Sequence, residues 1–87
     1  MSQPEEPFVE GLFLNGKAIS EDKLDEEVKL LGPGWVGMRV NHRNFNTIGV
    51  LVAAYLNKAG AAAKDAKVSV VHITTNSWVA YVFWYKP

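Results

Sequence analysis

The segment 78–85, near the C-terminus, constrains the fold most because it is apolar on both of its alternating faces. Successive side chains of a β-strand point to opposite faces of a sheet. One set here is Trp78, Ala80, Val82 and Trp84, and the other is Val79, Tyr81, Phe83 and Tyr85. Helices of a small domain cover one face of its sheet, and large apolar patches left exposed usually mark interfaces. We therefore expect a buried strand and a homo-oligomer, most simply a homodimer.

The chain ends with the pattern of a β-hairpin. Residues 67–74 are rich in β-branched side chains, and Thr75-Asn76-Ser77 separates them from the strand 78–86. Two such strands joined by a short polar turn are typical of a hairpin.

Further strands are expected in the first half of the chain. Residues 8–14 and 35–40 are strand candidates. Asn15-Gly16 is a tight-turn signal because both residue types tolerate positive φ. Residues 17–19 either pair back after this turn or lead directly into a helix.

Two segments have helical periodicity. In the first, Ser20 is a candidate N-cap, Leu24, Val28 and Leu31 share one face, and Gly32-Pro33-Gly34 ends the helix. The second starts at Thr47 and spaces its apolar residues at three and four: Ile48, Leu51, Val52, Tyr55, Leu56 and Ala59. Gly60 is its predicted cap, and residues 61–66 are either a further helical turn or a loop.

These elements predict an α+β fold in a single small domain. The order β-(β)-α-β-α-β-β gives a sandwich in which a mixed sheet of about four or five strands carries two helices on one face. With 87 residues the chain has room for one domain, which we place at residues 8–87. Residues 1–7 contain two prolines and two glutamates and are expected to form a flexible tail.

Charge is divided unevenly along a chain whose formal net charge is zero. Residues 1–31 carry eight acids against three lysines, and residues 32–87 carry one acid against six basic residues. The two parts either neutralise each other or leave the basic part free to face an anion. Because duplex-binding proteins usually have a pI above about 9 and this chain has a pI near 6.7, we expect no duplex nucleic acid partner.

Composition limits which cofactors, partners and cellular locations we expect. Without cysteine the chain has no disulfide and no thiolate ligand, and its two histidines lie far apart in sequence, so we expect no metal and no cofactor. No apolar run reaches the roughly 18 residues of a membrane span, and the start of the chain is acidic where a secretion signal is basic. We therefore expect no membrane partner and a cytoplasmic location, in a host cell.

The segment 39–47 is the one candidate for chemistry. It joins a strand to the second helix, where free backbone amides and the helix dipole attract anions. Its polar residues are Arg39, Asn41, His42, Arg43, Asn44, Asn46 and Thr47. Arg43 can bind a phosphate oxygen, and His42 can move a proton near neutral pH. The same residues can instead be a helix cap and a solvated charge, so both interpretations stay open.

The order of these features resembles the small viral ring nucleases, which act as type III anti-CRISPR proteins. The similar parts are the strand and loop 11–20, the Asn41-His42 step before an apolar helix, and the final hairpin 67–86. The resemblance implies a dimer that binds cyclic tetra-adenylate, with His42 as general acid and with Asn15, Ser20 and Lys86 as ligand contacts. The family's glutamate near the end of the hairpin has no counterpart beside Lys86, so whether the protein is an enzyme stays undecided.

Two functions are therefore expected. In the first, a small phage or mobile-element protein binds, and in one version cleaves, a cyclic oligonucleotide second messenger or another phosphorylated small ligand, and so counters a host defence. In the second, the chain is a non-enzymatic interaction module that docks on a host protein through its aromatic C-terminal strand.

Overall fold

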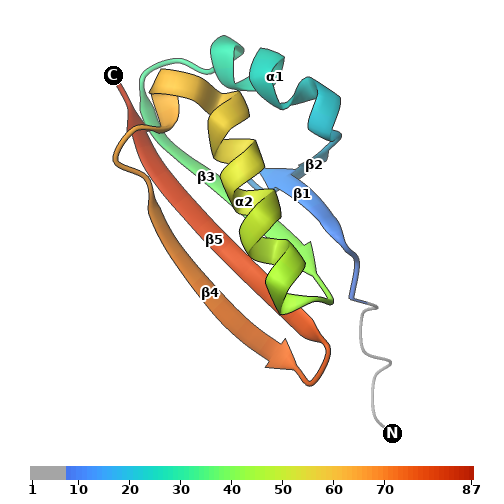
Figure 1. Ribbon diagram of the computed structural model, residues 1–87. Helices are drawn as coiled ribbons and strands as arrows, with labels where there is room; N and C mark the ends of the chain where they lie inside the picture. Colours follow the sequence, from blue (N-terminus) through green and yellow to red (C-terminus); the bar gives the residue numbers. More distant parts are fainter. Residues whose placement is uncertain (1–7) are drawn as a thin grey trace, which may run out of the picture.

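Five strands form one sheet in the order β2-β1-β3-β5-β4, and two helices cover one of its faces (Figure 1). The computed structural model describes residues 8–87, so the predicted tail 1–7 lies outside the described part of the chain. The strands are β1 (Gly11–Leu14), β2 (Lys17–Ile19), β3 (Gly34–His42), β4 (Lys67–Thr74) and β5 (Ser77–Lys86). The helices are α1 (Leu24–Leu30) and α2 (Phe45–Ala59), and two 3₁₀ turns cover Glu21–Lys23 and Gly60–Ala63.

This architecture confirms the expected α+β class, with one correction to strand direction. We expected a mixed sheet, but all pairings among the described strands are antiparallel. Helix α2 does return the chain so that β4 runs in the same direction as β3. However, β5 lies between β3 and β4, so the two parallel strands are not neighbours.

The Asn15-Gly16 turn joins β1 to a short β2, as its residue types predict. Both residues have positive φ, 49° and 82°, and Leu14 pairs with Lys17 across the turn. Asn15 also contacts β3: its backbone NH donates to the Gly37 carbonyl (2.7 Å), and its side-chain Oδ1 accepts from the Gly37 NH (2.9 Å). The turn therefore continues the β1–β3 hydrogen bonding beyond the end of β1.

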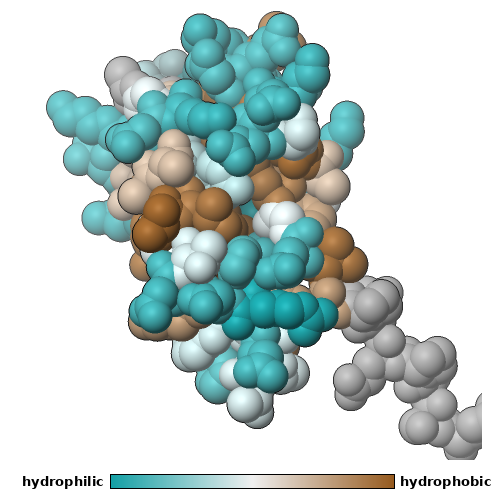
Figure 2. All heavy atoms as spheres, turned by 45° about the vertical axis from the view of Figure 1, so that its right-hand side comes forward, coloured by the Kyte–Doolittle hydropathy of each residue, from teal (hydrophilic) through white to brown (hydrophobic). Residues whose placement is uncertain are grey.

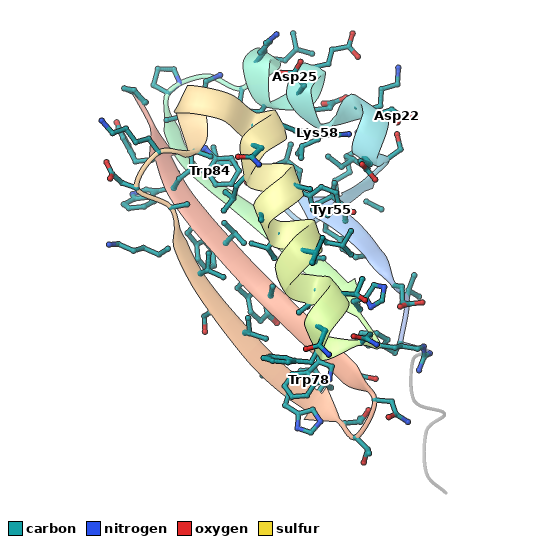
Figure 3. The ribbon with its side chains drawn as sticks, viewed as in Figure 1. Asp22, Asp25, Tyr55, Lys58, Trp78 and Trp84 are labelled. Atoms are coloured by element: carbon teal, nitrogen blue, oxygen red, sulfur yellow. The ribbon has the colours of Figure 1, made fainter. Side chains whose placement is uncertain are left out.

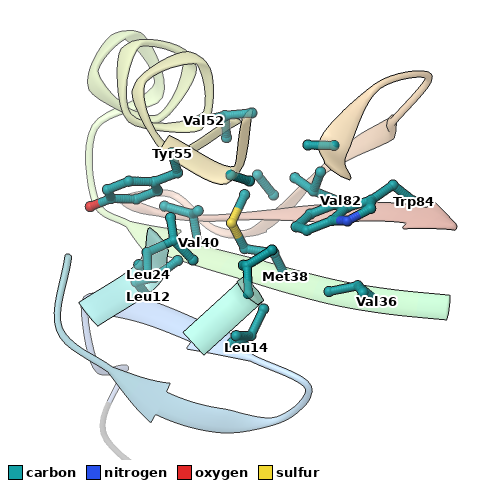
Figure 4. Packing of buried hydrophobic residues seen from close by; sticks show 14 of the residues in the cluster. Leu12, Leu14, Leu24, Val36, Met38, Val40, Val52, Tyr55, Val82 and Trp84 are labelled. Atoms are coloured by element: carbon teal, nitrogen blue, oxygen red, sulfur yellow. The ribbon is translucent and has the colours of Figure 1, made fainter. Parts of the chain in front are cut away.

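The core lies between the sheet and both helices (Figure 4). Strands β3 and β5 supply its centre, because Val36, Met38 and Val40 pair in register with Trp84, Val82 and Ala80. The other buried members come from β1, the helices and the second 3₁₀ turn: Leu12, Leu14, Leu24, Val28, Ile48, Val52, Tyr55, Ala59 and Ala63. Each large apolar side chain removed from water here contributes about 1.5–3 kcal/mol. The predicted apolar stripes of both helices are thus the surfaces that hold them on the sheet.

Both helix starts differ from the sequence prediction. Ser20 precedes the Glu21–Lys23 3₁₀ turn but its side chain makes no capping hydrogen bond; its carbonyl instead accepts from the Lys23 NH (3.0 Å), which tightens this turn. Helix α2 begins at Phe45, ahead of the predicted Thr47, because the Asn44 side chain accepts a hydrogen bond from the Thr47 NH (3.1 Å). Neither α1 nor α2 is long and apolar enough to cross a membrane, and the same holds for every helix in the described residues.

Lys86 connects the end of β5 to the end of α1. Its ammonium group donates to the carbonyls of Val28 (2.7 Å), Lys29 (3.3 Å) and Leu31 (2.5 Å). The Val28 carbonyl also accepts from the Leu31 NH (3.2 Å), so the cation adds a second donor there and matches the negative end of the helix dipole. Lys86 therefore closes the C-terminus of α1.

We predict that Lys86→Met lowers the free energy of unfolding by about 1–2 kcal/mol, because hydrogen bonds from a charged donor are lost and the carbonyls stay partly buried. Urea unfolding followed by circular dichroism measures this change. The exposed Lys17→Met is the matched control, with an expected change below about 0.5 kcal/mol. Equal stabilities of the two variants would contradict the capping role.

Because of Tyr55, the free energy of unfolding is expected to change with pH in the alkaline range. Burial, and next the Glu21 carboxylate, raise the pKa of Tyr55 above its ordinary 10.0, while Lys58 opposes this rise. A raised pKa in the folded state adds stability that is present below pH 10 and is lost as the pH rises through the folded value. We predict that wild type loses more stability than Tyr55→Phe between pH 9 and pH 11.5. Urea unfolding at both pH values measures this, and Tyr85→Phe, at an exposed tyrosine, should lose as much as wild type.

Candidate ligand-binding site

The junction of β3 and α2, where we expected an anion site, already holds a carboxylate of the chain itself. The Glu10 Oε2 accepts from the backbone NH of Arg43 (3.1 Å) and lies 3.3 Å from the His42 Nε2. The other ring nitrogen of His42, Nδ1, accepts from the Asn44 NH (3.0 Å). Both nitrogens of the predicted general acid therefore have partners within the fold.

The remaining polar side chains of this junction hold residues 8–10 against β3. Arg43 donates from Nη2 to the Phe8 carbonyl (3.2 Å), and its guanidinium lies 5.2 Å from the centre of the Phe8 ring. Asn41 donates from Nδ2 to the Val9 carbonyl (3.0 Å). Together with Glu10, these contacts fasten the segment that leads into β1.

The predicted ligand contacts do not meet at one point. Lys86 pairs with Gly34 at one end of β3, and His42 lies at the other end; eight residues at ~3.3 Å each put them roughly 26 Å apart. Ser20 lies before the 3₁₀ turn that leads into α1. The other histidine of the chain, His72, stacks on Trp78 with ring centres 4.0 Å apart. Figure 3 shows Trp78 at the opposite end of β5 from Trp84.

Three of the predicted site residues, Asn15, Arg39 and Asn41, do lie close together, on the side of the sheet away from the helices. We call this side the open face; strand alternation and register place on it Phe13, Trp35, Gly37, Arg39, Asn41, Lys67, Ser69, Val71, Ile73, Val79, Tyr81, Phe83 and Tyr85. Trp35, Phe83 and Tyr85 are 73%, 47% and 54% exposed. The open face is thus an aromatic surface that no described element of the chain covers.

Two hollows lie side by side on the open face, and both are lined by Arg39 and Tyr81. Hollow 1, of about 310 Å³, is further lined by Asn15, Gly16, Gly37, Met38 and Phe83. Hollow 2, of about 470 Å³, is further lined by Phe8, Val9, Phe13, Asn41, Ile73 and Val79. The absence of a side chain at Gly37 leaves room in hollow 1, since a Cβ at this position would contact the Phe83 ring at 3.4 Å.

The polar groups between the hollows have unused hydrogen-bonding capacity. The Arg39 guanidinium lies over the Phe13 ring, 4.2 Å from its centre. Its Nε, a donor, and the Asn41 Oδ1, an acceptor, are buried and have no hydrogen-bond partner. Buried polar atoms normally have a partner, so each of these two atoms gains a hydrogen bond if the side chains rotate and expose it to a polar molecule in the hollows.

The charges near the hollows favour an anion. Among the described residues of the open face, the charged ones are Arg39 and Lys67, and there is no carboxylate. The acidic side chains of α1 lie on the other side of the sheet, at the hydrophilic upper end of the molecule in Figure 2. Within the described residues, no three histidine, aspartate or glutamate side chains gather as a metal site.

The sequence therefore predicts Asn15, Arg39 and Asn41 as site residues, but the prediction groups them with residues that lie on the other face of the sheet. It grouped Arg39 and Asn41 with His42 because they are adjacent in sequence, whereas a strand sends alternate side chains to opposite faces. The spacing Gly37, Arg39, Asn41 is the signal that finds the open-face set. The contribution of Phe13 depends on its pairing with Arg39 across β1 and β3, and no local pattern shows that pairing.

We predict that Glu10→Ala frees the Arg43 amide, because its acceptor is removed. Hydrogen–deuterium exchange measured by NMR should show faster exchange at Arg43 and at the amides of residues 8–10. Glu27→Ala, at an exposed acid of α1, is the control and should leave these amides unchanged. Unchanged exchange in Glu10→Ala would show that Glu10 does not hold the junction.

Comparison with known proteins gives this chain no relative: no protein-family model matches it, and neither a curated protein nor a solved structure is significantly similar to it.

Proposed function

We propose that this protein binds a nucleotide ligand, a short oligonucleotide with unpaired bases, in the two hollows of its open face. The observation that carries the proposal is the Arg39 side chain, which lines both hollows among aromatic rings on a face with no described carboxylate; its Nε and the Asn41 Oδ1 also lack a hydrogen-bond partner. A donor with positive charge suits a phosphate oxygen, and an amide oxygen suits the amino group of a base. The ligand would lie across Arg39, with a base in each hollow.

The aromatic residues supply the second half of this recognition. Tyr81 borders both hollows, Phe83 borders hollow 1, and Phe13 borders hollow 2. Unpaired bases stack on such side chains with about 1–3 kcal/mol per base, with little sequence preference. A sheet that presents aromatic rings to single-stranded bases is also an established solution in RNA-binding domains. The neutral net charge fits a small ligand better than a long polyanion.

A cyclic oligonucleotide is the form that we propose first. The resemblance to the viral ring nucleases supports this choice, and a phage or mobile-element protein that binds such a messenger would withdraw it from a host defence. We propose binding without cleavage, because strand alternation directs His42 to the helix side of β3 while Arg39 and Asn41 face the hollows. The predicted acid is thereby separated by the sheet from the proposed ligand.

A thermal-shift screen with cyclic di-, tri- and tetranucleotides and their linear forms tests the proposal. Ligand at about 100 times its Kd stabilises the native state by about 2.7 kcal/mol, which is a rise in Tm of roughly 10 °C or more for a domain of this size. We predict such a rise with a cyclic species, its loss in Arg39→Gln, and in Arg43→Gln a rise that is weakened but not lost, because Arg43 holds Phe8 at the border of hollow 2. These two variants remove the same charge, one on the open face and one at the start of α2.

The variants separate the outcomes. If the rise in Tm is lost in Arg43→Gln and kept in Arg39→Gln, the binding site lies at the β3–α2 junction, which would contradict the open-face proposal. Gly37→Ala is an independent check, because its methyl group enters hollow 1 beside Phe83 without changing charge, and it should weaken binding. The Tm of each variant without ligand is the baseline. No shift with any nucleotide would exclude the proposal.

Docking of a host protein on the same aromatic surface is the second candidate. Trp35 and Tyr85 favour it: they form an edge-to-face pair with ring centres 5.6 Å apart, they are largely exposed, and they line neither hollow. Aromatic residues of this kind dominate the energetics of protein interfaces. If no nucleotide shifts the Tm, retention of a host protein by wild type and not by a Trp35→Ala, Tyr85→Ala variant would support docking.

A further inference from the structure

Strand β4 leaves its outer edge without a neighbour. It is the last strand of the sheet and pairs, among the described strands, with β5 alone. All eight of its residues are exposed. Helix α2 packs on β3 and β5, so the helix side of β4 is uncovered as well (Figure 1). A row of backbone NH and CO groups is therefore available to another strand.

This edge has few of the features that normally prevent strand pairing. Proteins protect sheet edges with proline, inward charges, bulges or very short strands. The opposite edge, β2, has three residues and is protected by its length. By contrast, β4 reads Lys-Val-Ser-Val-Val-His-Ile-Thr, with no proline and no acid, one lysine at its first position, and a register shift only between His72 and Thr74. Val68 and Val70 are 47% and 42% exposed.

We propose that two copies of the chain pair through their β4 strands, antiparallel and around a two-fold axis, so that their sheets join into one. The charges of the strand fit this arrangement. Lys67 is its one fully charged residue and lies at its beginning, so antiparallel pairing puts the two lysines at opposite ends of the interface. Parallel pairing in register would place them side by side.

The side chains of β4 are also compatible with their own copies. A two-fold axis perpendicular to the sheet keeps each face on its own side, so Val68, Val70 and His72 of one copy meet the same residues of the other. On the open face, Ser69 and Val71 meet their counterparts. Every such pair is apolar or small and neutral, apart from His72. Cross-strand pairs of such residues stabilise a sheet.

The proposal is independent of the nucleotide proposal, because the β4 edge lies beside the open face and binds the backbone of a second copy. Dimer formation would leave each open face intact, because joining the sheets places the two open faces next to each other on one side of the dimer. Loss of nucleotide binding would leave the dimer proposal untouched, and the reverse also holds.

Oligomeric state is tested first, by light scattering coupled to size exclusion at chain concentrations from 1 to 100 μM. Wild type should have twice the chain mass at the upper end of this range. Val70→Lys should be a monomer, since an axis near Val70 would bring two added charges together. Val50→Lys is the matched control, because Val50 is an equally apolar and more exposed valine (69%) on α2, and this variant should remain a dimer.

Cysteine cross-linking tests the arrangement without relying on a destabilised variant. The chain has no cysteine, so each of Ser69→Cys, Val70→Cys, Val71→Cys and His72→Cys carries one thiol. Directly opposed residues of antiparallel strands have Cα atoms about 4.5–5.5 Å apart, which a disulfide spans. Only the residue at the axis faces its own copy, so one position should cross-link fastest. Asn57→Cys on α2 should not cross-link.

Three results would overturn the proposal. The first is a monomeric wild type at 100 μM, which would leave the edge to a different chain. The second is a dimer that survives Val70→Lys and dissociates in Val50→Lys, which would assign the interface to α2. The third is equal cross-linking at all β4 positions and at Asn57→Cys, which indicates random collision.

Discussion

The pairing of β3 with β5 is the interaction on which the rest of this structure depends. It joins nine residue pairs, from Gly34 with Lys86 to His42 with Trp78. Because strand side chains alternate, this one register sends a valine-rich and tryptophan-containing set to the helices and an aromatic set to the open face. A slip of one residue would exchange the two sets on one strand, burying Arg39 and exposing Met38. The core and the candidate site are therefore two consequences of the same register.

Local signals predicted most of the fold. The period of Ile48, Val52 and Tyr55 needs only α2 itself, and the Asn15-Gly16 turn needs only the two residues that take positive φ. The closing hairpin was equally clear because its strands are adjacent in sequence. The mixed sheet was wrong for a reason that no local pattern contains: β5 enters the sheet between β3 and β4. Strand order depends on packing of the whole chain.

The site was less predictable because its members are distant in sequence. Arg39, Phe13 and Tyr81 meet only through the pairing of β1, β3 and β5. His42 and Arg43 were predicted as an anion site because they precede a helix. However, the carboxylate of Glu10, more than thirty residues earlier, accepts the hydrogen bond of the Arg43 NH there. Lys86 likewise serves α1 across the fold. Polar residues next to each other in sequence were read as one site, whereas the sheet separates them by face and by strand end.

The contact between Asn15 and Gly37 has a consequence for the chemistry of the two hollows. Asn15 satisfies both the NH and the CO of Gly37, so the backbone that forms the floor of hollow 1 has no hydrogen bond left to offer. Hollow 1 can therefore recognise shape and aromatic surface but little polarity. The unpartnered Asn41 Oδ1 gives hollow 2 the opposite character. The proposed ligand, with one polar and one flat apolar end, would lie across Arg39 in a single direction, so the open face would distinguish its two ends.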